Sequence, residues 1–198
     1  MTGLGNDYVY LDGFDRAISN PARLALRMSD RHFGVGSDGL VLILPSRHAD
    51  ARMRMFNADG SEAEMCGNAI RCVARYLFER RGVRSNPLNV ETKAGIKTIH
   101  LVIRNGRMTA ATVDMGVPIL DPDRIPVAAA SNRISLRGRE WTCVSMGNPH
   151  AVTFVDSIET APVQTEGPLL ERDPIFPKRC NIEFAQVINR RRIRLRRN

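Results

Sequence analysis

Apolar residues at helical spacing make residues 66–82 the most strongly patterned stretch of the chain. Hydrophobic side chains recur there every three or four residues, as in a helix that buries one face. They are Ile70, Val73, Ala74, Leu77 and Phe78. Gly82 follows the last of them, and glycine commonly lies just past the end of a helix. The pattern predicts an amphipathic helix that begins directly after Cys66 and ends before Gly82.

The rest of the first half alternates predicted strands with helices. Apolar runs and alternation predict strands at residues 8–11, 40–44, 52–56, 98–104 and 107–115. Asn20 followed by Pro21 predicts a helix start. Asn105 and Gly106 are typical of a tight hairpin turn between the last two of these strands. This alternation predicts a fold of the α/β (α+β) class.

Prolines within residues 116–126 mark the expected domain boundary, which gives domains of residues 1–115 and 116–198. Beyond this boundary, short strands are expected around Ile134, Thr142, Val152 and Glu183. Residues 162–177 form a proline-punctuated segment with no predicted element.

The end of the chain repeats a pattern found earlier. Residues 192–196 alternate arginine with Ile193 and Leu195, which predicts a strand with one charged face rather than a nucleic-acid-binding arm. Residues 52–56 show the same alternation before the turn that leads to Cys66. This faint internal repeat suggests two related halves.

Composition excludes several classes of protein. Six arginines in residues 190–197 carry most of the net charge of +8, and aromatic residues, only 6% of the chain, do not interleave with them. A nucleic-acid partner is therefore not expected. No apolar stretch predicts a membrane span or a signal peptide, so we expect a cytoplasmic location. The four cysteines indicate reduced thiols, and no Cys/His spacing indicates a metal site.

Cys66 is the strongest candidate for chemistry. A thiol at a helix N-terminus lies near unpaired N–H groups and the positive end of the helix dipole, which favour the thiolate. The ordinary alternative is a buried structural thiol. Cys72 falls inside the same predicted helix and is expected to serve packing or to lie on the surface. The glycine-rich residues 34–39 lack the spacing and the lysine of a phosphate-binding loop, so we interpret them as a tight turn.

Several segments taken together resemble the diaminopimelate epimerase family. They are residues 3–8, 30–39, 56–72, 113–116, 146–152 and 181–184. The resemblance implies two similar α/β domains with the active site between them. It also implies inversion at an amino-acid α-carbon without a cofactor, with diaminopimelate as a small-molecule substrate and a homodimer as the assembly.

The resemblance further implies roles for individual residues. Cys66 would be one of two acid/base cysteines, and the backbone of Gly67 and Asn68 would contact the substrate α-carboxylate. Four asparagines would hold the rest of the substrate: Asn6, Asn57, Asn148 and Asn181. His150 would tune the pKa values of the thiols. The ordinary alternatives are turn asparagines and a structural histidine, and the residues alone do not decide between them.

The chain also departs from the family pattern. The resemblance places a second catalytic cysteine, preceded by a Glu-Arg pair, beyond the predicted strand at residues 192–196, whereas the sequence ends at Asn198. We therefore expect a C-terminally truncated member with an incomplete second domain and impaired activity. Cys180 adjoins Asn181 but lacks a helix start to activate it, and Cys143 lies in an apolar strand pattern that indicates packing.

Two other functions remain open at this point. One is a different amino-acid racemase or isomerase of the same fold, such as the proline racemase group. The other is a non-catalytic relic that still binds its ligand. We also expect a fold that is stable mainly in its first domain and prone to association, because an incomplete second domain leaves an apolar face uncovered.

Overall fold

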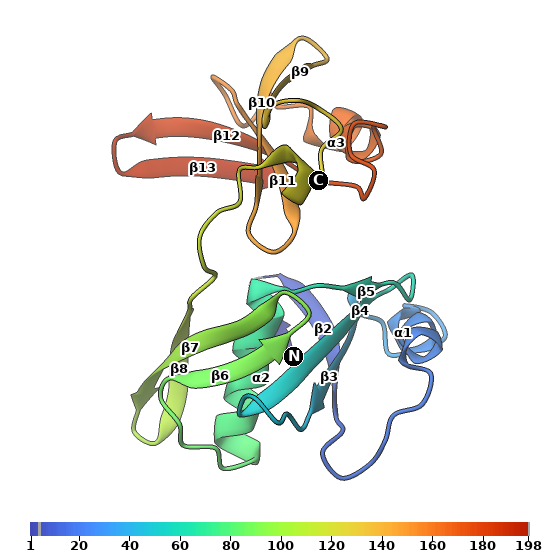
Figure 1. The fold of residues 1–198 in the computed structure, drawn as a ribbon, viewed down its shortest axis with the longest axis vertical. Helices are drawn as coiled ribbons and strands as arrows, with labels where there is room; N and C mark the ends of the chain where they lie inside the picture. The colour runs from blue at the N-terminus through green and yellow to red at the C-terminus, as the bar shows by residue number, and fades with distance from the viewer. Residues whose placement is uncertain (4, 198) are drawn as a thin grey trace. The chain divides into compact units, whose positions relative to one another are not determined.

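The chain forms a mixed α/β fold of two sheets and few helices (Figure 1). The structure is a computed structural model that describes residues 1–3 and 5–197. The chain divides into two compact units, Met1–Met115 and Gly116–Asn198, called unit 1 and unit 2 below. Each unit has one sheet and its own buried cluster of apolar side chains.

Unit 1 contains an eight-stranded sheet. In spatial order the main strands are β1 (Thr2–Gly3), β2 (Asn6–Asp12), β3 (Gly39–Leu44), β4 (Ala51–Asn57), β6 (Leu88–Thr92), β7 (Gly95–Arg104) and β8 (Arg107–Val113), and β5 (Glu62–Ala63) pairs with β4. β2 runs parallel to β3, and β3 runs antiparallel to β4. The turn between β7 and β8 has positive φ at both Asn105 and Gly106, which confirms the predicted hairpin.

Helix α2 (Gly67–Arg80) covers one face of this sheet (Figure 1). The five apolar residues of the predicted helical face are all buried, as expected from their spacing. They pack against Val41 and Ile43 of β3 and Met53 and Met55 of β4. Gly82 adopts a left-handed φ of 69° just past the helix, so the predicted end is also confirmed.

Helix α1 (Pro21–Ser29) packs on the opposite face of β3 and β4. The Asn20 side chain accepts a hydrogen bond from the Arg23 N–H, as predicted for a helix cap. Leu40 and Leu42 face α1, whereas Val41 and Ile43 face α2. The continuous apolar run of β3 is therefore explained by burial on both sides.

Unit 2 contains a five-stranded sheet around a separate core. In spatial order the strands are β13 (Arg192–Arg197), β12 (Asn181–Asn189), β11 (Pro149–Phe154), β10 (Arg139–Ser145) and β9 (Arg133–Leu136). Trp141 and Phe184 meet edge to face at the centre of the core, with ring centroids 5.4 Å apart. A short 3₁₀ turn, η1 (Pro122–Arg124), lies in the segment that enters this unit.

Helix α3 (Val163–Glu171) lies in the proline-punctuated segment, where the sequence predicts no element. Gly167 and Pro168 oppose helix formation inside it, which hides the helix from propensity and periodicity. Val163 and Leu170 are buried in the unit 2 core. Tertiary packing therefore holds a helix that the local sequence disfavours.

The two units share one order of elements. In unit 1 the parallel strands β2 and β3 are joined through α1, and the antiparallel strand β4 follows. In unit 2 the parallel strands β11 and β12 are joined through α3, and the antiparallel strand β13 follows. β4 and β13 hold the two alternating segments of the sequence. In unit 1 this arrangement continues into α2.

One face of β12 and β13 carries exposed apolar side chains. The register pairs Val187 with Ile193, and Ala185 lies between Leu195 and Phe154, so these residues share a face. Four of them are more than half exposed: Phe154, Val187, Ile193 and Leu195. The predicted strand at residues 192–196 is confirmed, but its apolar face is exposed as well as its arginine face. Among the described residues, no helix is long and apolar enough to cross a membrane.

This exposed apolar face predicts self-association of the 198-residue protein. We expect binding of a hydrophobic dye and a sedimentation coefficient that rises with protein concentration, because exposed apolar patches of this kind promote association. Replacing both Ile193 and Leu195 by Asn should lower dye fluorescence by about half. Leu26→Asn is the matched control, since Leu26 is 50% exposed on α1. A protein that binds no dye and stays monomeric at every concentration contradicts this prediction.

Candidate active site

The start of α2 combines a thiol with unpaired backbone N–H groups. Cys66 is extended, with φ −140° and ψ 116°, and directly precedes the helix. The first helical hydrogen bond runs from the Ile70 N–H to the Cys66 carbonyl, at 3.0 Å. The N–H groups of Gly67, Asn68 and Ala69 therefore find no acceptor within the helix. Such N–H groups, at the positive end of a helix dipole, form an arrangement that binds carboxylates.

The Cys66 side chain makes no capping hydrogen bond and is half-buried against the unit 1 core. Met115 lies close by, since a methyl group added at Gly67 would lie 3.6 Å from its sulfur. Cys66 is thus held by apolar contacts on one side and keeps partial exposure to solvent. This position matches the prediction that Cys66 precedes the helix.

The other three cysteines are buried. Burial raises the pKa of the Cys143 thiol to about 11, and burial also raises the pKa of the Cys180 thiol. Cys72 lies inside α2, with Tyr10 beside it. Burial, with a further contribution from Cys72, raises the pKa of the Tyr10 phenol, which stays protonated at neutral pH. Cys66 is therefore the one cysteine with partial access to solvent.

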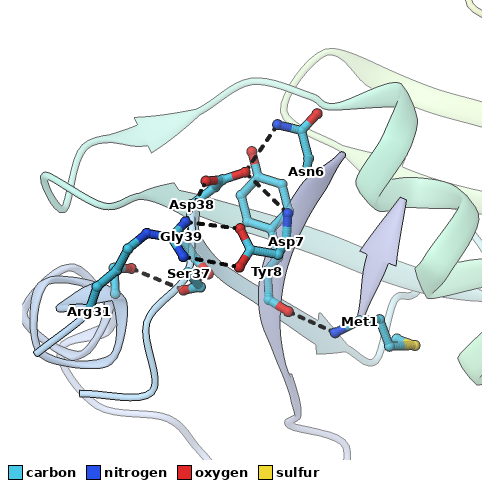
Figure 2. Close-up of polar contacts among 9 residues, drawn as sticks. Met1, Asn6, Asp7, Tyr8, Arg31, Ser37, Asp38 and Gly39 are labelled. Atoms are coloured by element: carbon cyan, nitrogen blue, oxygen red, sulfur yellow. Dashed lines mark hydrogen bonds and ion pairs between the residues drawn. The ribbon is translucent and has the colours of Figure 1, made fainter. Parts of the chain in front are cut away.

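A hydrogen-bonded chain joins the start of α2 to the start of β2. The Asn68 side-chain amide donates to the side-chain oxygen of Asn6 at 2.8 Å. The Asn6 amide in turn donates to the Asp38 carboxylate at 3.2 Å (Figure 2). The structure thus brings Asn6 into direct contact with Asn68, which lies two residues beyond Cys66.

Asn57 lies at the same end of the unit 1 sheet. It ends β4, where the register places it opposite Gly39, and Gly39 in turn lies opposite Tyr8 of β2. The Asn57 amide donates to the Ser61 hydroxyl at 3.0 Å, inside the turn that follows. Its side chain therefore stabilises this turn.

The remaining predicted residues gather in unit 2. His150 and Asn181 are register partners at the first ends of β11 and β12. One ring nitrogen of His150 lies 2.8 Å from Glu183 and the other lies 3.1 Å from the side-chain oxygen of Asn148. The Asn181 amide donates to the Pro149 carbonyl at 2.9 Å. Asn148, His150 and Asn181 therefore form one polar cluster.

Glu183 is the member of this cluster that the sequence does not single out. It lies two residues after Asn181 on the same face of β12. The alternation of side chains along a strand could therefore have identified Glu183 as a neighbour of Asn181. Its carboxylate accepts a hydrogen bond from Nδ1 of His150, which fixes the orientation of the ring. Asn181 also lines a cavity of about 260 Å³, together with Pro149, Cys180 and the charged side chains of Glu171, Lys178 and Arg179.

Unit 1 thus holds five of the eight predicted site residues and unit 2 holds the other three. Unit 1 contributes Asn6, Asn57, Cys66, Gly67 and Asn68, and unit 2 contributes Asn148, His150 and Asn181. No group of three or more His, Cys, Asp and Glu side chains in the described part of the chain is arranged to hold a metal ion.

Two solved structures share this fold. A PhzF-family phenazine biosynthesis protein of Bacillus anthracis matches with a TM-score of 0.65 and 19% identity, over 100% of this chain and 67% of its own. A probable proline racemase of Agrobacterium radiobacter K84 matches with a TM-score of 0.64 and 19% identity, over 89% of this chain and 58% of its own. At this identity the likeness shows the fold alone.

Sequence comparison is more specific. The family model for diaminopimelate epimerase matches residues 1–120 and 142–197. A diaminopimelate epimerase of Acetivibrio thermocellus is 51% identical, over 99% of this chain and 72% of its own length. Another, of Desulfovibrio desulfuricans, is 50% identical, over 99% of this chain and 73% of its own length. The chain is thus shorter than these relatives, and it belongs to the diaminopimelate epimerase family of isomerases.

Proposed function

We propose that this protein inverts one α-carbon of diaminopimelate, between the LL and meso isomers, with Cys66 as one acid/base thiol and no cofactor. The observation that carries this proposal is the position of Cys66 directly before α2, beside N–H groups that have no hydrogen-bond acceptor within the helix. From the family resemblance we also propose a homodimer, a cytoplasmic location and a role in making lysine and peptidoglycan precursors.

The chemistry explains why a thiol belongs at this position. The α-proton of an amino acid is weakly acidic, and no cofactor delocalises the carbanion that its removal creates. A thiolate can take the proton on one face, while an acid on the other face delivers a proton to complete the inversion. The N–H groups of Gly67 and Asn68 would bind the α-carboxylate and stabilise the negative charge that develops beside it.

The asparagines suit the distal end of such a substrate. A neutral amide can donate to a carboxylate and accept from an ammonium group, and the second amino-acid end of diaminopimelate carries both. We propose this role for Asn6, Asn57, Asn148 and Asn181, as the family resemblance implies. His150, held by Glu183 at 2.8 Å, would tune the protonation of the reacting thiol.

None of the other three cysteines is placed to act as the second acid/base thiol. Cys72, Cys143 and Cys180 are buried, and none of them precedes a helix. Burial raises the pKa of both Cys143 and Cys180, which disfavours the thiolate that a base requires. We therefore propose that the 198-residue chain exchanges the α-proton on one face faster than it inverts the centre.

Cys66 should be the first thiol to react with a small alkylating reagent in the folded protein. The other three should react at least about tenfold more slowly, because they are buried and burial raises the pKa of the Cys143 thiol to about 11. Peptide mapping by mass spectrometry after timed labelling checks this order. Cys66→Ser should remove the fast phase and Cys143→Ala should leave it unchanged. Faster labelling of any other cysteine would contradict the assignment.

Incubation with LL- and meso-diaminopimelate in D₂O tests the reaction itself. We expect loss of the α-proton NMR signal from at least one isomer, with inversion clearly slower than exchange. Cys66→Ala should abolish the exchange, and Cys72→Ala, the matched thiol in the same helix, should retain it. Absence of exchange with both isomers would contradict the role of Cys66. Inversion as fast as exchange would show that a second acid/base group is present.

A further inference from the structure

We propose that Asp38 is a positioning residue, whose carboxylate sets the orientation of the Asn6 and Asn68 amides at the start of α2. This inference rests on the proposed function, since it names what holds two of its substrate-binding side chains in place. Neither the periodicity of the sequence nor its motifs assign a role to Asp38, which closes the glycine-rich turn before β3.

The hydrogen bonds form one continuous chain. Asp38 accepts from the Asn6 amide at 3.2 Å and from the Asp7 N–H at 3.1 Å, both at the same oxygen (Figure 2). Asn6 accepts from the Asn68 amide at 2.8 Å. The side-chain oxygen of Asn68 accepts from the Arg71 guanidinium. The two amides therefore lie between a carboxylate at one end and a guanidinium at the other.

The two ends of this chain have opposite hydrogen-bonding character. The oxygen and nitrogen of an asparagine amide have almost the same shape, so packing alone does not fix which way the amide faces. An aspartate carboxylate only accepts hydrogen bonds, and an arginine guanidinium only donates them. Asn6 must therefore turn its NH₂ group toward Asp38, and Asn68 must turn its oxygen toward Arg71. Each amide in the middle is fixed by its neighbour.

The glycine-rich turn is built to hold Asp38. Arg31 lies 3.1 Å from the carboxylates of both Asp7 and Asp38, so that one cation bridges two acids (Figure 2). A hydrogen bond from Arg31 lowers the pKa of Asp7. The Asp38 N–H donates to the Asp7 carbonyl at 2.7 Å. A methyl group at Gly34 would lie 2.2 Å from the Arg27 carbonyl, so glycine is required where the turn folds back onto α1.

The orientation of the two amides matters because a ligand would bind the amide atoms that these hydrogen bonds leave free. The described bonds use one N–H and the oxygen of each amide, which leaves each NH₂ group with a second N–H to donate. If the Asn6 amide turned over, a ligand carboxylate facing that N–H would meet an oxygen instead. Loss of Asp38 should thus weaken ligand binding indirectly, through Asn6, because Asp38 itself would not contact the ligand.

A double-mutant cycle on ligand affinity tests this inference. Asp38→Asn should weaken diaminopimelate binding about tenfold, because it removes the acceptor-only end of the chain. Asn6→Ala should weaken binding as well, and the double variant should bind no more weakly than Asn6→Ala alone. Asp38→Glu, which keeps the carboxylate, should restore part of the affinity. Additive effects of the two substitutions would overturn the inference.

Asp50→Asn is the matched control. Asp50 also accepts from a hydroxyl and a backbone N–H, those of Ser85 and Asn89, each at 2.7 Å, but it has no bond to Asn6. This variant should leave the dissociation constant unchanged within about twofold. A tenfold loss here would mean that any lost carboxylate in unit 1 weakens binding, which would also overturn the inference.

The NMR signals of the Asn6 and Asn68 side-chain NH₂ groups give a readout without ligand. Both should shift in Asp38→Asn, although Asn68 does not touch Asp38, and unchanged signals would overturn the inference. If Asp38→Asn does not fold, Asp38→Ser gives the same test, because serine also removes the carboxylate. A wild-type protein that binds no diaminopimelate would contradict the proposed function, while the amide signals would still decide the role of Asp38.

Discussion

Burial of one face of α2 against the unit 1 sheet determines where the candidate site lies. Ile70, Val73 and Leu77 have no exposed surface, and a close-packed core does not let such a helix turn or slide. The helix start is thereby fixed at one end of the sheet, and Cys66 with it. The same packing that stabilises unit 1 therefore determines where a thiol and the unpaired N–H groups lie.

Local patterns in the sequence predicted the elements that local physics determines. The apolar spacing of α2, the cap of α1 and the Asn105-Gly106 turn all depend on residues close together in the chain. Helix α3 was missed because Gly167 and Pro168 oppose it locally and only burial supports it. Local patterns do not predict the hydrogen-bond partners of the site residues, because these partners are far apart in the sequence. Asn6 and Asp38 are 32 positions apart, and His150 and Glu183 are 33 positions apart.

The two units differ in what becomes of the same order of elements. In unit 1 the face of the sheet beside β4 is covered by α2, and the cysteine at the start of α2 is only half-buried. In unit 2 the corresponding strand β13 carries exposed apolar side chains, and both cysteines of the unit are buried. In unit 1 one helix therefore both covers the sheet and places the half-buried Cys66 at its start.

We propose that the start of α2 binds the carboxylate of an amino acid beside Cys66. Titration of ¹⁵N-labelled protein with diaminopimelate, followed through the backbone amide signals, tests it most directly. We expect the N–H signals of Gly67, Asn68 and Ala69 to shift first and furthest, with saturation at a single dissociation constant. Saturable shifts confined to other parts of the chain, with these three signals unmoved, would contradict it.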